Sequence, residues 1–295
     1  MVGPRFWCRF RLAAPILAGV LSSGAAAAPD AAPPATSATE VRITHVGNAG
    51  FLVEAGGKKV IIDALYRAGV PGHVVLSREV QNAAEAGRAP FDGVSLVLAT
   101  HVHNDHFDGN AVGRHLLSNP AATFVTTPQT VARMEQVFPA FSAVAARVRG
   151  VFPPEGEKLA VDVNGLGLKV LTLHHGRTTP FQNIGFLLDL DGATLLHVGD
   201  TEASHPELGR YALPAERIDV AFVPFWYLLD ELGRKALQDA IGARTIVPMH
   251  IPAPGAPSAL FGPGQDRNGV LQLLRQMKDV LVLEGEMETK VVPLG

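Results

Sequence analysis

Residues 100–106 read Thr-His-Val-His-Asn-Asp-His, and this stretch decides the fold that the sequence predicts. It contains four side chains that bind metals, namely His101, His103, Asp105 and His106. Imidazole nitrogens and carboxylate oxygens are the ligands that zinc and similar cations accept. Four such groups cannot all face one side of a helix, but they can converge on a tight loop. The stretch therefore predicts a metal-binding loop, and the alternative is a solvated polar loop.

Other metal-binding side chains also follow apolar runs. Residues 94–99 precede the loop and read as a short buried strand, which would hold the loop in place. His174 and His175, Asp200 and His250 each follow a further predicted strand. Adjacent residues of an extended chain point in opposite directions, so only one of the two adjacent histidines can face a metal.

The pattern His-x-His-x-Asp-His after an apolar strand resembles the signature of the metallo-β-lactamase superfamily, and the resemblance extends from about residue 41 to residue 292. It implies an α+β fold, a four-layer αββα sandwich of two mixed sheets flanked by helices. It also implies a site for two metal ions, in which a histidine that precedes a glycine is a ligand, and this favours His175 over His174. The implied ligands are His101, His103 and His175 for one metal, Asp105, His106 and His250 for the other, and Asp200 as a bridge.

The resemblance implies a metal-dependent hydrolase. Two divalent cations, zinc by preference and otherwise manganese or iron, would share a hydroxide that attacks an ester, lactone, amide or phosphodiester bond of a small molecule or lipid. Asp105, His175 and His250 are then also catalytic candidates. Two alternatives stay open: a di-iron redox member of the superfamily, and a non-catalytic metal-binding protein.

The position of the chain within the superfamily is a further expectation. Residues 47–51, Gly-Asn-Ala-Gly-Phe, and the absence of a cysteine ligand resemble the branch of L-ascorbate-phosphate lactonases and N-acylphosphatidylethanolamine phospholipases. This departure from the cysteine-bearing enzymes that degrade antibiotics makes penicillin a poor candidate substrate.

Five further residues are candidates for substrate binding: His174, Arg177, His205, Trp226 and Tyr227. The two aromatic residues follow the apolar run of residues 218–224, and aromatic side chains at a strand exit often form a substrate wall. Ordinary packing is the alternative for them.

Several polar residues near the predicted strands have a structural alternative. His45 and Asn48 are expected to be structural rather than to face the site. Asp63, at the end of a strand, is a candidate to orient a metal ligand, or else a turn cap. His197 is expected in the core or behind a ligand. His73 is expected to be exposed, and contact with the substrate is the alternative for it.

The N-terminus has the layout of a secretory signal peptide, predicted over residues 1–28. Three arginines precede an apolar run at residues 12–21, and small residues follow. Residues 29–40 are rich in Ala, Pro, Ser and Thr, and we expect a disordered lead-in. Residues 41–295 would form a single domain. The chain is thus predicted to be exported, either periplasmic or secreted, with no integral membrane segment after cleavage; an uncleaved anchor is the alternative.

Composition narrows the possible partners. The only cysteine, Cys8, lies in the predicted leader, so the mature chain would have no disulfide and no thiolate ligand. The formal charge is −3, and no basic stripe appears, so we expect no nucleic-acid partner. The oligomeric state is not predicted.

The pattern of apolar and turn residues predicts that the domain begins with antiparallel strands of a sheet, followed by alternating strands and helices. Residues 64–90 show no clear period and are predicted to form a loop, such as a lid. The predicted strands are residues 41–46, 51–54, 58–62, 94–99, 122–126, 159–163, 168–173, 184–190, 193–198, 218–224, 245–248, 280–283 and 289–292. The predicted helices are residues 107–117, 128–137, 228–241 and 268–278.

Overall fold

The structure is a computed structural model, and it describes residues 38–176, 179–202 and 205–295. The described residues belong to one compact unit. The predicted signal peptide and residues 29–37 of the predicted lead-in lie outside the described residues. The last residues of that lead-in are bonded to the domain, because the Ala38 N–H donates to the Asp191 carbonyl (2.8 Å) and the Thr39 carbonyl accepts from Leu294 (2.9 Å).

The first sheet is mixed, with strand order β13-β1-β2-β3-β4-β5-β6. Strands β1, β2 and β3 pair antiparallel through short turns, and β13, from the end of the chain, pairs antiparallel with β1. Strands β3 to β6 run parallel. Parallel neighbours need crossover connections, and helices supply them. The strands are β1 (Glu40–Gly47), β2 (Gly50–Ala55), β3 (Lys58–Ile62), β4 (Leu96–Leu98), β5 (Thr123–Thr126), β6 (Val148–Gly150) and β13 (Glu288–Pro293).

The second sheet is also mixed, with strand order β12-β11-β10-β9-β8-β7. Strands β7 to β10 form an antiparallel meander, and β10, β11 and β12 run parallel. The strands are β7 (Lys158–Val163), β8 (Leu166–Thr172), β9 (Ile184–Leu190), β10 (Ala193–His197), β11 (Val220–Pro224) and β12 (Thr245–Met249).

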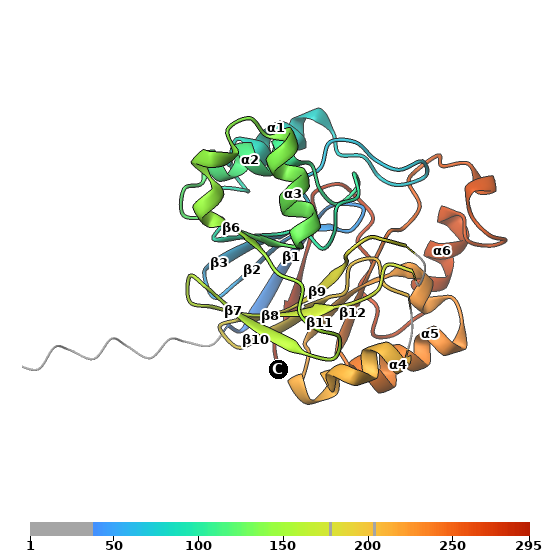
Figure 1. The fold of residues 1–295 in the computed structure, drawn as a ribbon. Helices are drawn as coiled ribbons and strands as arrows, with labels where there is room; N and C mark the ends of the chain where they lie inside the picture. The colour runs from blue at the N-terminus through green and yellow to red at the C-terminus, as the bar shows by residue number, and fades with distance from the viewer. Residues whose placement is uncertain (1–37, 177–178, 203–204) are drawn as a thin grey trace, which may run out of the picture. The chain divides into compact units, whose positions relative to one another are not determined.

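Helices cover the outer faces of both sheets (Figure 1). Buried residues of α1, α2 and α3 pack on the first sheet, and those of α4 and α5 pack on the second. The predicted four-layer αββα sandwich is therefore confirmed. The helices are α1 (Arg78–Glu85), α2 (Gly109–Ser118), α3 (Pro128–Val137), α4 (His205–Leu208), α5 (Glu231–Ala236) and α6 (Arg267–Leu274).

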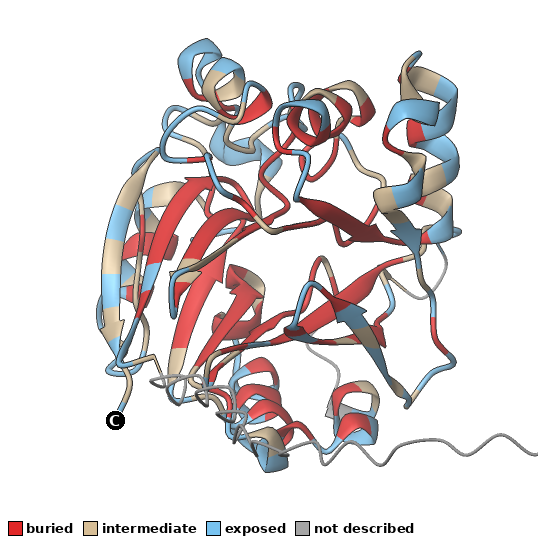
Figure 2. Cartoon of the chain, turned by 90° about the vertical axis from the view of Figure 1, so that its left-hand side faces the viewer, coloured by how far each residue is buried: buried red, intermediate tan, exposed pale blue. Residues whose placement is uncertain are grey.

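The two sheets share a continuous apolar core (Figure 2). Phe51 of β2 meets Phe222 of β11 with ring centroids 4.5 Å apart, so aromatic packing joins the sheets directly. Both rings are fully buried. No helix among the described residues has the length and apolar character needed to cross a membrane.

Two predicted segments differ from the structure. The predicted loop of residues 64–90 contains α1, which begins after Ser77, whose hydroxyl accepts from the Val80 N–H. The helix is short and buries a charged residue, Glu85, so its apolar period is incomplete. The predicted strand at residues 280–283 is wrong: only Val280 forms an isolated bridge, with Ile246 of β12.

Glu85 ties α1 to its surroundings. Its carboxylate accepts from the Arg67 guanidinium and from Arg114 Nε at 2.6 Å. Burial would raise the pKa of Glu85, but the hydrogen bonds from both arginines outweigh burial and lower it. The stabilisation is therefore present above the pKa of the unfolded chain, and it is lost as the pH falls through the folded-state value.

We expect Glu85→Gln to lower the free energy of unfolding by about 1–2 kcal/mol near neutral pH, since both arginines are partly exposed. Urea unfolding from about pH 7 toward pH 3 would measure this. The difference from wild type should shrink with acidity. Glu79→Gln, exposed on the same helix, is the control. An equal loss at every pH would contradict the ion-pair interpretation.

Candidate metal centre

Loops that follow β4, β8, β10 and β12 meet at one edge of the sandwich. His101 and His103 follow β4, and His175 follows β8. Their ligand nitrogens all lie within 4.8 Å of one another, and His101 Nε2 is 3.0 Å from His103 Nδ1. Two ligands of one cation at bonds of about 2.0–2.1 Å lie roughly 3 Å apart, so the spacing suits a shared metal.

Asp200, which follows β10, lies between two sets of imidazoles. Its Oδ2 is 3.9 Å from His101 Nε2 and 3.6 Å from His175 Nε2. Its Oδ1 is 3.3 Å from His106 Nε2 and 2.6 Å from His250 Nε2. Each carboxylate oxygen thus faces a different pair of nitrogens, which is the arrangement of a carboxylate that bridges two cations.

The second group of candidate ligands contains His73, which was not predicted to bind a metal. The ligand atoms of Asp105 and His250 lie within 4.8 Å of His73, and His73 Nδ1 is 2.8 Å from Asp105 Oδ2. His106, the expected third member, is grouped instead with His101 and Asp200. The expectation that His73 is exposed is wrong, because its side chain is only 23% exposed.

Asp63 sets the direction of two ligands from beneath. This fully buried carboxylate accepts from the Thr100 N–H and hydroxyl (both 2.7 Å) and from His106 Nδ1 at 2.8 Å. Because the Thr100 hydroxyl donates to Asp63, it accepts from His101 Nδ1 at 3.0 Å. Both imidazoles therefore carry a proton on Nδ1 and turn Nε2 toward Asp200.

Asn48 and His250 are held together on the other side of the site. The buried Asn48 amide donates to Asp105 Oδ2 at 2.9 Å, so Asn48 serves the site directly, contrary to expectation. Its carbonyl accepts from the His250 N–H at 3.3 Å. His250 has φ +61°, a left-handed conformation that costs a non-glycine residue energy and occurs often at functional sites.

His45 and His197 have structural contacts, as expected. His45 Nδ1 is 3.1 Å from the Gly285 carbonyl. His197 Nε2 is 3.0 Å from the Ala49 carbonyl and 4.0 Å from Asp63 Oδ2. His197 Nδ1 also accepts from the Gly199 N–H at 3.2 Å, so this ring supports the turn that precedes Asp200.

Several buried atoms of the site have no hydrogen bond among the described residues. They are His106 Nε2, His175 Nε2, Asp200 Oδ1 and both ring nitrogens of His250. Buried polar atoms normally have partners, so this convergence of unpaired ligand atoms is what bound cations would satisfy. The donor set of imidazoles and carboxylates suits zinc, manganese or iron.

The electrostatics of the site favour positive charge. Burial opposes the ionised form of Asp200, but His106 and His250 outweigh burial and lower its pKa well below the usual range. Burial likewise raises the pKa of Asp105, but the hydrogen bond from His73 and the nearby imidazoles lower it to about 2. Burial lowers the pKa of His101 well below its usual range, so this ligand is neutral at pH 7.

The surroundings of His106 also stabilise positive charge. Burial lowers its pKa, but the carboxylates of Asp200 and Asp63 outweigh burial and raise the pKa well above the usual value. A positive charge at this position is therefore stabilised, and a metal cation supplies one without a proton.

Comparison with known proteins agrees with this geometry. The model of the family described as "Beta-lactamase superfamily domain" matches residues 58–251, which carry every one of these ligand candidates. The chain belongs to this superfamily. The predicted superfamily is thereby confirmed, whereas the predicted branch within it stays a prediction.

Relatives within the superfamily are described as metal-dependent hydrolases. The UPF0173 metal-dependent hydrolase of Thermococcus kodakarensis is 28% identical over 219 residues, which cover 71% of this chain and 84% of that protein. The predicted metal-dependent hydrolase is thus confirmed at this coarse level.

Solved structures of hydrolases share the superfamily fold. Igni18, a metallo hydrolase from Ignicoccus hospitalis, is 21% identical with a TM-score of 0.53, covering 87% of this chain and all of that one. An isothiocyanate hydrolase from Delia radicum gut bacteria is 18% identical with a TM-score of 0.56, covering 86% of this chain and all of that one. At these identities the likeness concerns the fold alone.

The predicted substrate residues of this superfamily member lie in different environments. Both ring nitrogens of His174 are occupied, since Nδ1 and Nε2 lie 3.0 Å from Glu207 and Glu155 respectively. Trp226 is half-buried with its ring 5.3 Å from that of His250, and it can border a substrate. Tyr227 is fully buried, so the structure corrects its expected place on a substrate wall.

Two aromatic residues instead secure the segment after Asp200. Trp226 Nε1 donates to the Thr201 carbonyl at 3.2 Å, and the Tyr227 hydroxyl donates to the Glu202 carbonyl at 2.9 Å. These bonds fix the backbone that follows Asp200.

Two other predicted substrate residues have side chains outside the described part of the chain, and one residue near the site was not predicted. Arg177 and the side chain of His205 lie outside the described residues. Phe181 was not predicted, although its ring lies 4.2 Å from that of His103 and 6.1 Å from that of His175. A lone phenylalanine in a loop carries no signal in the sequence that would have revealed this contact.

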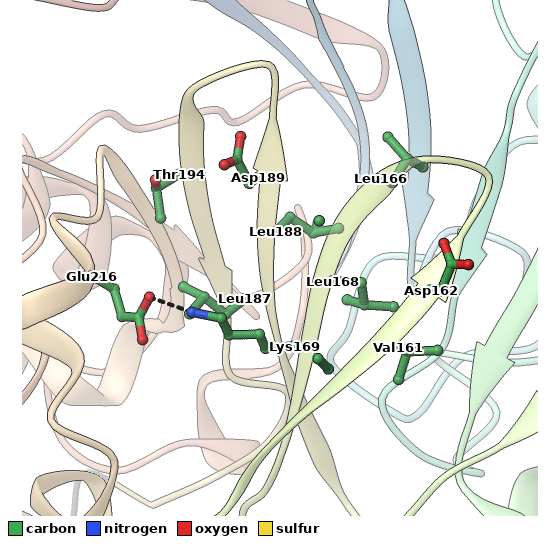
Figure 3. A pocket seen from close by; sticks show the side chains of 12 residues that line it. Val161, Asp162, Leu166, Leu168, Lys169, Leu187, Leu188, Asp189, Thr194 and Glu216 are labelled. Atoms are coloured by element: carbon green, nitrogen blue, oxygen red, sulfur yellow. Dashed lines mark hydrogen bonds and ion pairs between the residues drawn. The ribbon is translucent and has the colours of Figure 1, made fainter.

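A hollow of about 370 Å³ lies away from the metal-binding loops (Figure 3). Strands β7 to β10 line it, and Lys169 pairs with Glu216 at 2.8 Å on one side. It has no histidine among its lining residues, and its portion of β8 is the start of the strand rather than the end that leads to His175. The hollow is therefore separate from the candidate metal centre.

We expect Asp63→Asn to weaken zinc affinity by about 10–100-fold, because one acceptor oxygen becomes a donor, and the amide cannot accept from the Thr100 N–H and from His106 Nδ1 at once. Competition with a chromophoric chelator would measure the affinity, and circular dichroism would check folding. Asp162→Asn, on an exposed residue of β7, is the matched control. Unchanged zinc affinity in the Asp63 variant would contradict the orienting role.

Proposed function

We propose that the protein hydrolyses an ester, lactone, amide or phosphodiester bond of a small molecule or lipid with the help of two divalent cations, zinc by preference. The observation that carries the proposal is the position of Asp200, whose two oxygens face separate pairs of imidazole nitrogens. Bound cations would lower the pKa of a water between them, so that hydroxide is available near neutral pH.

The proposed ligands of the first cation are His101, His103 and His175. Those of the second are Asp105, His106 and His250, with Asp200 shared between the two cations. Two aspartates against two divalent cations leave the site positive, which would favour the negative charge that develops on an attacked carbonyl or phosphoryl group. We also propose Asp105, His175 and His250 as catalytic residues through their place in these ligand sets.

The chain's own residues pre-position this centre. Thr100 and Asp63 fix the ring orientations of His101 and His106, so these ligands need little reorganisation when a cation binds. The Phe181 ring lies beside His103 of the first ligand group, and the Trp226 ring lies beside His250 of the second. Both rings offer apolar surface to a substrate. We therefore also propose that the substrate carries an apolar group beside the scissile bond.

We expect chelation to abolish hydrolysis and zinc to restore it, because every proposed step needs the cations. A panel of p-nitrophenyl esters, lactones, anilides and bis-p-nitrophenyl phosphate, assayed before and after metal removal, would measure this. Asp200→Asn should lower the rate of hydrolysis by more than about 100-fold. This loss exceeds the loss typical when a residue that only hydrogen-bonds to a metal ligand is replaced. Asp162→Asn is the control.

The outcomes of this test separate the alternatives. Iron with a reducible absorption spectrum, and no hydrolysis, would favour a di-iron redox protein. Bound zinc without turnover of any substrate class would favour a non-catalytic metal-binding protein.

We further propose that the chain is exported to the periplasm or the medium. The basic, apolar and small-residue layout of residues 1–28 supports this. N-terminal sequencing of the protein from cell fractions would test it, and an intact N-terminus in the cytoplasm would contradict it.

A further inference from the structure

The segment between β3 and α1 is fixed where it approaches the metal centre. On one side of His73, the Ala253 N–H donates to the Gly72 carbonyl at 2.8 Å. On the other side, the hydroxyl of the buried Tyr66 donates to the Val74 carbonyl at 2.9 Å. Two anchors on adjacent residues hold the backbone of His73 in place, so its position at the centre is built into the fold.

The side chain of His73 points into the second group of ligands. Its Nδ1 lies 2.8 Å from Asp105 Oδ2, and its ring lies 5.0 Å from that of His250 at an interplanar angle of 70°. The ligand atoms of the three residues all lie within 4.8 Å of one another. They therefore surround a volume of the size that one cation occupies.

His73 is closer to Asp105 than the expected ligand His106 is. His106 Nε2 lies 3.8 Å from Asp105 Oδ2 and 3.3 Å from Asp200 Oδ1. The bridging carboxylate thus draws His106 toward the middle of the centre. The outer side of the second group is left to His73, Asp105 and His250.

We propose that His73 is an additional ligand of the second cation, beside Asp105, His106 and His250. This inference rests on the proposed binuclear function. The second cation would then have four terminal protein ligands and the first cation three. The open coordination position for a substrate would consequently lie at the first cation, near Phe181.

A different role for His73 would be to orient Asp105 through an N–H···O hydrogen bond alone. The two roles are separable, because the asparagine amide nitrogen can occupy the position of the histidine Nδ1. His73→Asn would keep a hydrogen-bond donor for Asp105 but remove the imidazole ligand. His73→Ala would remove both.

The experiment measures zinc bound to the full-length protein by atomic spectroscopy after dialysis at graded chelator strength. Wild type and Val70→Ala, an exposed control on the same segment, should bind two equivalents. His73→Ala and His73→Asn should keep the first equivalent and bind the second at least about 10-fold more weakly. Visible absorption of the cobalt-loaded proteins should show the loss of one imidazole from the second site.

A measurement on the wild type alone guards against variants that fail to fold. Zinc should move the ring-nitrogen NMR signals of six histidines into the metal-bound range, the six being His73, His101, His103, His106, His175 and His250. A count of five that excludes His73 would overturn the inference. So would full retention of the second zinc in His73→Asn or His73→Ala. A wild type that binds one equivalent would overturn the binuclear proposal itself together with this inference.

Discussion

The metal centre depends on the hydrogen bonds that the buried carboxylate of Asp63 accepts. Asp63 directly follows β3 with φ +47°, and its carboxylate accepts hydrogen bonds from both Thr100 and His106. A buried carboxylate without partners would cost several kcal/mol, so the loop after β4 is held in the one arrangement that supplies its donors. In that arrangement Nδ1 of His101 and of His106 is hydrogen-bonded, and Nε2 of each ring faces Asp200.

The sandwich determines which loops can share that site. Ligand candidates of the first sheet follow β3 and β4, and those of the second sheet follow β8, β10 and β12. Aromatic packing between Phe51 and Phe222 sets the two sheets against each other, so the loops from both converge at one edge. Asp200 then makes contacts with ligands from both sheets, including His106 and His250. The strained backbone of His250 is maintained because Asn48 of the first sheet accepts its N–H.

Predictions from sequence succeeded where the signal was local. The antiparallel start and most later strands were found, because apolar runs bounded by turn residues are short-range patterns. The helix α1 was missed because it buries Glu85, which interrupts the apolar period. The segment at residues 280–283 resembles a strand but pairs only through Val280. Its composition could not reveal that no neighbouring strand would pair along its length.

The sequence by itself determined the family, the types of the candidate ligands and their order along the chain, since four side chains of metal-binding type within residues 101–106 restrict the chemistry severely. Tertiary structure alone decided the roles of His73, Asn48 and Tyr227. The first two reach Asp105 from elsewhere in the chain, and the third is buried under the segment after Asp200. Single polar or aromatic residues carry no pattern, and only the packing of distant segments specifies what they contact.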